Sequence, residues 1–318
     1  MADIVCFGDL LIDFVPLESG LPLAEVPAFK KAPGGAAANV AVGLAKLGVS
    51  SSFIGKVGDD AFGHFLAQTL RDEGVETDAM RFDNRARTAL AFVTLAADGE
   101  RDFLFYRHPS ADMLFTPGEV DQSAIAQASI FHFDSISLAA EGPRKTALFA
   151  ADHARTLGKR ISYDVNLRLP LWADADAAKA GIKDGLSRAH IMKLSDDELE
   201  FLTGARRAEA VRQQLWHDDL QLAVVSIGQA GAILLTPDAT FEVPSIAVKP
   251  VDTTGAGDGF VAGLLAALHA EPDLLSAPEK LVEATRFANA VGALTTTQRG
   301  AIPALPTREM VNAALAAA

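Results

Sequence analysis

The sequence has 318 residues, of which 49% are hydrophobic and 22% charged, as expected for a globular protein with one large core or two domains. Its net charge of −13 argues against broad nucleic-acid binding, since an acidic surface repels phosphate backbones and no Lys/Arg-rich run offsets it. No apolar stretch reaches the roughly 18 residues of a membrane-spanning helix. The first residues lack a secretory signal pattern, and the single cysteine, Cys6, excludes an internal disulfide, so we expect a cytoplasmic protein without a membrane partner.

Short apolar runs alternate with helical patterns along the chain. The predicted strands are Ile4–Phe7, Ser52–Ile54, Ile130–Phe133, Ile161–Asp164, Ile191–Leu194 and Leu222–Ile227. Helical patterns over Ala37–Leu47 and Pro143–Leu157 are each followed by a glycine, which readily adopts the left-handed conformation that ends a helix. The alternation predicts an α/β fold with three layers, in which helices cover both faces of a mostly parallel sheet.

Two segments interrupt this alternation. Residues Phe14–Lys31 contain several prolines and little helical periodicity, whereas Thr88–Tyr106 alternates like a β-hairpin around Asp98-Gly99, a dipeptide typical of tight turns. We expect the two segments to form a small discontinuous β lid, which would exclude water from a reaction. The predicted division is a lid of residues 14–31 and 88–107 over a core of residues 1–13, 32–87 and 108–318.

The segment with the most chemistry is Asp252-Thr253-Thr254-Gly255-Ala256-Gly257-Asp258-Gly259-Phe260, which precedes a predicted helix at Val261–Leu268. Small residues let an anion approach the backbone, and the first N–H groups of a helix have no internal partner, so this turn can bind a phosphoryl group. Asp258 at its edge is placed to accept a proton from a hydroxyl. The alternative is a glycine-rich loop whose carboxylate caps the helix.

Other phosphate-binding and catalytic motifs are absent from the sequence. There is no G-x-x-x-x-G-K-[ST], which excludes a Walker P-loop, and neither G-x-S-x-G nor H-E-x-x-H is present. Gly255-x-Gly257 lacks the third glycine of a dinucleotide-binding fingerprint.

A second run of small residues, Pro33-Gly34-Gly35-Ala36-Ala37-Ala38-Asn39-Val40, opens another helix. Its glycines allow a ligand close to the backbone, and the Asn39 amide both donates and accepts hydrogen bonds. Close packing of helix on sheet, with a structural amide, is the alternative.

Together the two segments resemble the two signatures of the PfkB carbohydrate kinase family. The matching residues are Gly34-Gly35-x-x-x-Asn39 and Asp252-Thr253-x-Gly255-Ala256-Gly257-Asp258, and Gly8-Asp9-x-x-x-Asp13 follows the first strand as it does in that family. The resemblance covers nearly the whole chain and is closest to the fructokinases. It implies a ribokinase-like αβα core with a β lid, ATP with Mg²⁺, and transfer of the γ-phosphoryl group to a sugar hydroxyl.

The resemblance also implies roles for individual residues. Asp258 would be the catalytic base, and Asp9 would make a strand-end hydrogen bond. The amides of an anion hole would come from Gly255, Ala256 and Gly257. Sugar hydroxyls, which need short directional partners, would be held by Asp13, Gly34, Gly35, Asn39 and Asp258.

Two further segments resemble those of fructokinases. In Asp164-Val165-Asn166-x-Arg168, the Arg168 guanidinium would steady phosphate charge near the substrate through a forked contact, with a surface ion pair as the alternative. In Arg107-x-Pro109-Ser110-Ala111-Asp112-Met113, Arg107 would reach the sugar from the lid side. His108 stands where the family commonly has Asn, so a sugar contact at that position is in doubt.

The remaining matches concern the nucleotide and metal ions. Lys193-x-Ser195-x-x-Glu198 resembles an element that organises Mg²⁺ and phosphate; Ser195 favours a capping box, and Glu198 would act on Mg²⁺ through water. The implied ATP-binding residues are Lys193, Ser226, Gly228, Gly231, Gly257 and Asn289, although Asn289 is equally a polar residue on a helix face. A K⁺ site would be formed by Asp252, Thr254, Thr295, Gln298 and Gly300.

We therefore predict phosphorylation of D-fructose to D-fructose 6-phosphate by MgATP. The nearest alternatives are kinases acting on 2-keto-3-deoxygluconate, ribose or a nucleoside, because Arg107 or Arg168 would also suit an acidic sugar. A non-catalytic sugar-binding regulatory relative is the alternative of another class, although it has no need of the base in Gly-Ala-Gly-Asp258. Exposed lid strands also predict a homodimer formed through the lid.

Overall fold

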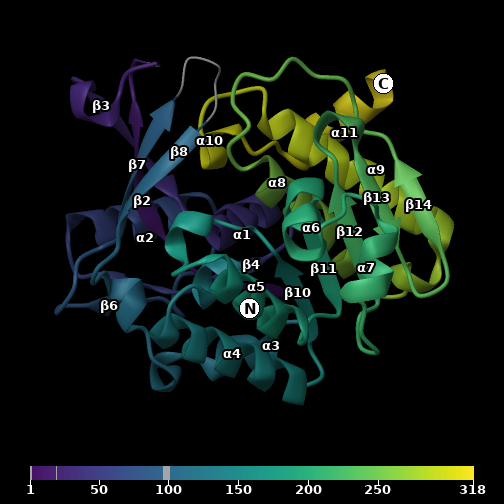
Figure 1. Cartoon of the computed structure of the whole chain (residues 1–318), viewed down its shortest axis with the longest axis horizontal. Coiled ribbons are helices and arrows are strands. Elements are labelled where there is room, and N and C mark those ends of the chain that lie inside the picture. The colour runs from purple at the N-terminus through teal and green to yellow at the C-terminus, as the bar shows by residue number, and fades with distance from the viewer. Residues whose placement is uncertain (1, 19, 96–100) are drawn as a thin grey trace.

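The computed structural model describes residues 2–18, 20–95 and 101–318. An eight-stranded sheet with the order β14-β13-β12-β11-β10-β9-β1-β4 forms its centre (Figure 1). The strands are β1 (Ile4–Phe7), β4 (Ser51–Ile54), β9 (Ile130–Asp134), β10 (Arg160–Asp164), β11 (Ile191–Ser195), β12 (Leu222–Ser226), β13 (Ala232–Leu235) and β14 (Thr240–Val243). All pairs from β4 to β12 are parallel, and β13 and β14 extend the sheet in antiparallel fashion.

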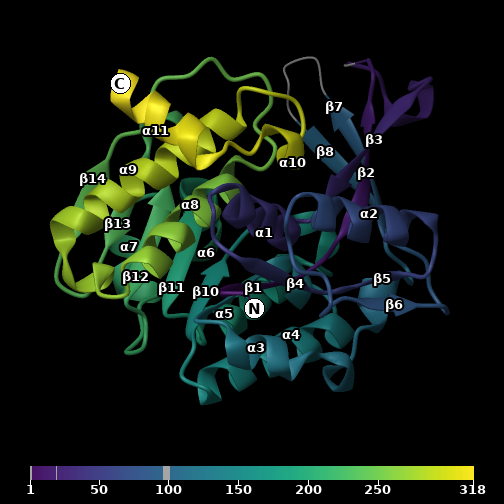
Figure 2. The same cartoon turned by 180° about the vertical axis from the view of Figure 1, so that it is seen from behind.

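Alternate side chains of the central strands enter two different cores. In β1, Ile4 and Cys6 pack on one face, whereas Val5 and Phe7 pack on the other, as expected from the two-residue period of a strand. The first face is covered by α1 (Ala36–Lys46), α2 (Ala61–Asp72), α8 (Ala256–Ala270), α9 (Pro278–Thr295), α10 (Ala301–Ala304) and α11 (Arg308–Ala317), which face the viewer in Figure 2. The second is covered by α3 (Gln122–Gln127), α4 (Glu141–Thr156), α5 (Ala175–Leu186), α6 (Asp196–Thr203) and α7 (Glu209–Gln214). The predicted αβα architecture is confirmed.

A separate four-stranded sheet has the order β3-β2-β7-β8. Its strands are β2 (Leu11–Pro16), β3 (Phe29–Gly34), β7 (Leu90–Leu95) and β8 (Arg101–Tyr106). Phe92 joins the hairpins, because its ring stacks on Phe14 at 5.0 Å and meets Phe29 and Tyr106 edge-on at 5.4 Å each. Strands β2 and β3 pair from Leu11 opposite Gly34 onward, so the sheet extends beyond both ends of the predicted lid segment 14–31. The predicted Asp98-Gly99 turn lies outside the described residues.

A pair of short parallel strands, β5 (Lys56–Gly58) and β6 (Arg81–Asp83), lies beside this region. The Lys56 ammonium is buried there and pairs with Asp83 at 2.6 Å and with Glu119 at 2.8 Å, so its charge is compensated. In the described part of the chain, none of the helices is both long enough and apolar enough to cross a membrane.

Candidate active site

The glycine-rich turn leads into α8 earlier than the sequence predicted. The helix begins at Ala256 rather than Val261, because Gly255 adopts a left-handed conformation (φ 77°) that turns the chain directly into it. A Cβ at Gly255 would lie 2.7 Å from Ala301 Cβ, so the position also has no room for a side chain. The chain therefore places Gly257 and Asp258 within the first helical turn.

One of the three predicted donors already has an acceptor within the turn. The Ala256 N–H donates to the Thr253 carbonyl at 3.2 Å and is thereby partly engaged. Helix geometry leaves the N–H groups of Gly257 and Asp258 without an intrahelical acceptor. Of the predicted donors, Gly257 therefore keeps its N–H available, Asp258 offers one more, and anion binding by this turn stays a prediction.

Asp258 connects the two motifs found in the sequence. Its carboxylate is buried and accepts a hydrogen bond from Asn39 Nδ2 at 2.7 Å, across 219 residues of sequence. The pKa of Asp258 is raised to about 6, mainly by burial and also by the nearby Asp164 carboxylate, while the Asn39 hydrogen bond, Arg168 and Lys193 oppose the rise. A carboxyl group with this pKa can accept a proton near neutral pH.

Lys193 stands beside the start of α8. Its ammonium contacts both carboxylate oxygens of Asp164, at 3.1 and 3.2 Å. A Cβ at Gly257 would lie 3.0 Å from the Lys193 Nζ atom, which places the cation next to the first turn of the helix. Burial favours the neutral amine, but Asp164 and Glu198 outweigh it and raise the Lys193 pKa, so the side chain remains a cation.

Ser195 and Glu198 form the capping box expected from the sequence. The Glu198 N–H donates to Ser195 Oγ at 3.1 Å, and Glu198 Oε2 accepts from the Ser195 N–H at 2.7 Å. Glu198 Oε1 accepts from the Leu167 N–H, also at 2.7 Å, so the carboxylate joins the start of α6 to the loop after β10. Each oxygen retains a lone pair for another partner.

Four of the residues predicted to hold the sugar lie in two contacting pairs, Asp13 with Gly34 and Asn39 with Asp258. The Asp13 carboxylate covers Gly34, where any Cβ would overlap it. Gly35 (φ 122°) caps α1 at a point where a Cβ would overlap the Asp9 carbonyl, which positions Asn39 one turn later.

The two arginines occupy different surroundings. Arg107 is buried and forms an ion pair with Asp112, whose other oxygen accepts from Ser110 Oγ at 2.5 Å, so the guanidinium is already engaged. Arg168 is half-buried and donates to the adjacent Leu167 carbonyl at 2.9 Å. It lies near enough to Asp258 to lower the pKa of that carboxyl group.

Asp134 was missed by the sequence analysis. It is fully buried at the end of β9, directly opposite Asp164 in the strand register, and its Oδ2 atom has no hydrogen-bond partner among the described residues. Burial, together with the carboxylates of Asp9, Asp164 and Asp258, raises its pKa. Its position directly after the predicted strand Ile130–Phe133 was a usable signal, because ligands bind at the carboxyl ends of parallel strands.

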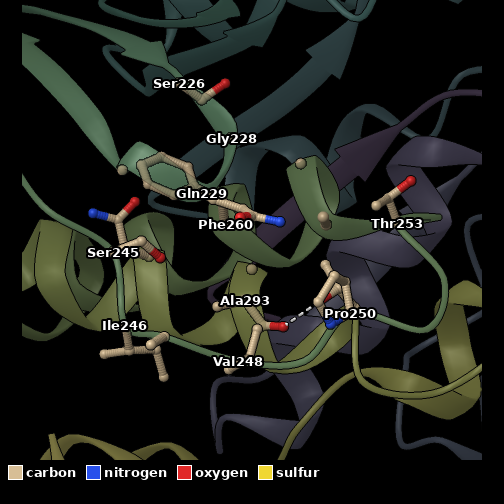
Figure 3. Close-up of a pocket in the computed structure, with 17 residues that line it drawn as sticks. Ser226, Gly228, Gln229, Ser245, Ile246, Val248, Pro250, Thr253, Phe260 and Ala293 are labelled. Atoms are coloured by element: carbon tan, nitrogen blue, oxygen red, sulfur yellow. Dashed lines mark hydrogen bonds between the residues drawn. The ribbon is translucent and has the colours of Figure 1, made fainter.

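A cavity of about 430 Å³ adjoins the start of α8. Five residues expected to bind the nucleotide line it, namely Ser226, Gly228, Gly231, Gly257 and Asn289. Lys193, the sixth, lies next to Gly257. The apolar walls come from Ile246, Val248 and Phe260, which the sequence analysis did not single out. Figure 3 shows the segment from Ser245 to Pro250 along one side of the cavity and the loop after β12 on the other.

The predicted cation-binding loop is organised by Asp252. Its Oδ1 accepts from the N–H and hydroxyl of Thr254 at 2.8 and 2.7 Å, and its Oδ2 accepts from the Gly300 N–H at 2.8 Å. The hydroxyl of Thr295, at the end of α9, donates to Val291 O in the same helix at 2.8 Å. The structure thus brings Asp252, Thr254 and Gly300 together, while K⁺ binding stays a prediction.

Known proteins resemble the chain over its whole length. It matches the pfkB family carbohydrate kinase over residues 1–308. A probable fructokinase-7 of Arabidopsis thaliana is 54% identical over 312 residues, covering 97% of this chain and 91% of the relative. Fructokinase-2 of Solanum habrochaites is 52% identical over 305 residues, covering 96% and 93%.

Two solved structures are similar in fold and sequence. Fructokinase from Xylella fastidiosa with bound ATP superposes with a TM-score of 0.91 and 37% identity, covering 100% of this chain and 99% of that one. Fructokinase from Vibrio cholerae in its fructose-, ADP- and calcium-bound form gives a TM-score of 0.87 and 36% identity, covering 99% of each chain. With the Asn39–Asp258 contact and the glycine turn at the start of α8, these matches show that the chain belongs to the pfkB family of carbohydrate kinases.

Proposed function

We propose that the protein transfers the γ-phosphoryl group of MgATP to a hydroxyl of D-fructose, giving D-fructose 6-phosphate. The observation that carries the proposal is the position of Asp258. Its buried carboxylate follows Gly257, which lines the cavity, and is held by Asn39 from the second motif. The similarity to fructokinases over nearly the full chain supports fructose as the acceptor.

In this proposal each residue has a defined task. The N–H groups of Gly257 and Asp258, at the positive end of the α8 dipole, stabilise charge on the phosphoryl group being transferred. One Asp258 oxygen accepts the proton of the sugar hydroxyl while Asn39 holds the other. Lys193, fixed by Asp164, adds positive charge beside the same helix turn.

We expect a divalent ion to enter the site with the nucleotide. When bound, Mg²⁺ would supply positive charge that offsets the negative charge of the ATP phosphates. Within the described residues no group of three or more His, Cys, Asp or Glu side chains is arranged to hold a metal ion directly. Both Glu198 oxygens are held by backbone N–H groups and retain lone pairs, which suits a contact through water.

A monovalent cation is the second proposed ion. The Asp252 carboxylate, with Thr254 and Gly300 bonded to it, fixes a loop beside the start of α8. Carboxylate and carbonyl oxygens are suitable ligands for K⁺, and Thr295 and Gln298 would supply carbonyls. We expect KCl to raise the turnover rate relative to choline chloride at the same ionic strength, and Asp252→Asn to abolish that difference.

The choice of sugar is tested by steady-state rates with coupled ADP detection. The proposal expects the highest kcat/KM with D-fructose among fructose, 2-keto-3-deoxygluconate, ribose and adenosine. A preference for the keto acid would identify the nearest alternative and would indicate Arg168 as the cation that binds it, since Arg107 is already paired with Asp112. Sugar-dependent ADP release below detection at high enzyme concentration would instead indicate a non-catalytic binding protein.

Assembly and location are also proposals. The exposed Leu104 and Tyr106 lie on β8, at the edge of the four-stranded sheet, where an unpaired strand can pair with a second copy, so we propose a homodimer through this proposed lid. Sedimentation analysis of the full chain would contradict it by finding only monomer. A cytoplasmic location fits the single buried Cys6, and imaging of the tagged full-length protein tests it.

A further inference from the structure

A second cavity lies at the amino ends of the core strands, opposite the candidate active site. Its volume is about 510 Å³. Its floor comes from the residues that open or precede adjacent parallel strands: Ile130 in β9, Arg160 in β10, His190 before β11 and Gln221 before β12. Asp134 and Asp164 end two of the same strands, so the two sites are separated by about 16 Å, the length of a five-residue strand.

The charge of this cavity is opposite to that of the protein. The chain has 41 Asp and Glu residues against 28 Lys and Arg residues. Among the described residues that line the cavity there is no Asp or Glu, whereas the basic ones are Arg155, Lys159, Arg160, His190 and His269. A concave surface lined by one sign of charge concentrates ions of the other sign.

Among the described residues, two of these cations form no ion pair. Arg155 pairs with Asp219 and His269 with Asp3, whereas Lys159 and Arg160 are in no ion pair. The Lys159 ammonium donates to Ala126 O at 2.6 Å, and Arg160 Nη2 donates to Pro272 O at 3.2 Å. Partial burial lowers the pKa of Arg160, and the negative charge of Asp273 opposes this effect.

Both cations also have an ordinary structural role. Ala126 lies in the last turn of α3 and Pro272 follows α8, and cations at such carboxyl ends commonly bind the last carbonyls. That role uses one N–H donor of each side chain, whereas Arg carries five donors and Lys three. Helix capping therefore leaves most of their hydrogen-bonding capacity available.

We propose that this cavity binds a small phosphate-bearing anion, either inorganic phosphate or a phosphate monoester, held by Lys159 and Arg160. The planar fork of a guanidinium matches two phosphate oxygens, and the lysine adds a compact charge. His190 supplies a further donor, because its Nδ1 accepts the Ile161 N–H at 2.9 Å and its neutral ring therefore carries the proton on Nε2. The contacts that support this anion site do not depend on the phosphoryl transfer proposed above.

The test is calorimetric titration of the full chain with inorganic phosphate, and separately with fructose 6-phosphate. Saturating fructose, Mg²⁺ and a non-hydrolysable ATP analogue occupy the active site throughout. We expect saturable binding by the unmodified protein and an affinity at least tenfold lower in the double variant Lys159→Gln, Arg160→Gln. The matched control is Lys145→Gln, which removes an exposed lysine near the opposite end of α4.

The outcomes separate the sources of the ligand and the causes of failure. Binding of both probes indicates a general phosphate site, and binding of fructose 6-phosphate alone indicates a site that also contacts the sugar. Either result supports the proposal if the double variant no longer binds that probe. Equal affinity in the double variant, or no saturable heat in the unmodified protein, overturns it. Unchanged turnover of the double variant shows that the loss is not due to misfolding, and an equal loss in Lys145→Gln would reduce the effect to net charge.

Discussion

The proposed nucleotide side and the proposed acceptor side of the candidate active site consist of different kinds of residues. The cavity beside α8 is formed by small residues, backbone atoms and apolar side chains such as Ile246 and Phe260. The acceptor side is formed by buried ionisable groups that influence one another, with Asp258 at the centre and Asp164 and Lys193 beside it. The contrast predicts that substitutions on the acceptor side alter kcat and its pH dependence, whereas those on the nucleotide side alter the KM for ATP.

The largest effect is expected for Asp258→Asn. The amide keeps the shape of the side chain but cannot accept the hydroxyl proton, and general-base help is worth roughly 10²–10⁴-fold. We expect kcat to fall at least about a hundredfold, with fructose and ATP still bound in calorimetry. Asp238→Asn, which changes an exposed carboxylate, is the control; near-normal turnover of Asp258→Asn would remove Asp258 from its role.

The same variant should be more stable than the unmodified protein above pH 6. The folded-state pKa of Asp258 is raised to about 6, so the folded protein binds the proton more tightly than the unfolded chain does. Stability due to this group is present at low pH and is lost as the pH rises through about 6, and a two-unit shift corresponds to at most about 3 kcal/mol. In thermal melts from pH 4 to 8, the difference in Tm between Asp258→Asn and the unmodified protein should disappear on acidification. A difference that grows on acidification would contradict the assignment.

The third prediction concerns Asp164→Asn. Loss of its charge releases Lys193 from its position beside Gly257, and we expect kcat to fall roughly tenfold, as displaced catalytic groups commonly do. Removing the carboxylate also lowers the pKa of Asp258, so the acid limb of the rate profile should move to lower pH. A lower rate with an unmoved limb would mean that Asp164 supports only the fold.

The smallest effect is expected on the nucleotide side, at Ser226→Ala. The hydroxyl lines the cavity and has only a long contact, 3.4 Å, with Leu194 O, so its loss should leave the fold intact. One hydrogen bond of about 1 kcal/mol corresponds to a roughly fivefold higher KM for ATP. Unchanged values of kcat and of the KM for fructose would sharpen the contrast between the two sides, and a large fall in kcat would break it.

Much of the site could be predicted because its residues lie within two short motifs. Gly255 is required by a left-handed turn, and Gly257 leaves space beside the Lys193 ammonium, and both features appear directly as glycine in the sequence. Ser195 and Glu198 were likewise readable, because a capping box depends on residues three apart. Strand and helix alternation predicted the layers for the same reason: each signal is local.

The parts that were missed depend on how strands pair and how loops fold, which residue spacing does not specify. The sequence places Asp134 at a strand end, but no spacing in the sequence reveals the register that sets it opposite Asp164. The pairing of Arg107 with Asp112 depends on how the loop after β8 folds back, which a motif cannot specify. The helix start at Ala256 was placed too late because the alanine and glycine run looked like a loop; Gly255 alone makes the turn.

The most direct test of the account is the pH dependence of kcat/KM for fructose at saturating MgATP. The account predicts an acid limb with a midpoint near pH 6, the pKa of the buried Asp258, and a shift of that limb to lower pH in Asp164→Asn. A profile that stays flat through pH 6 while the protein remains folded would contradict it, because the proton acceptor would then have to be another group.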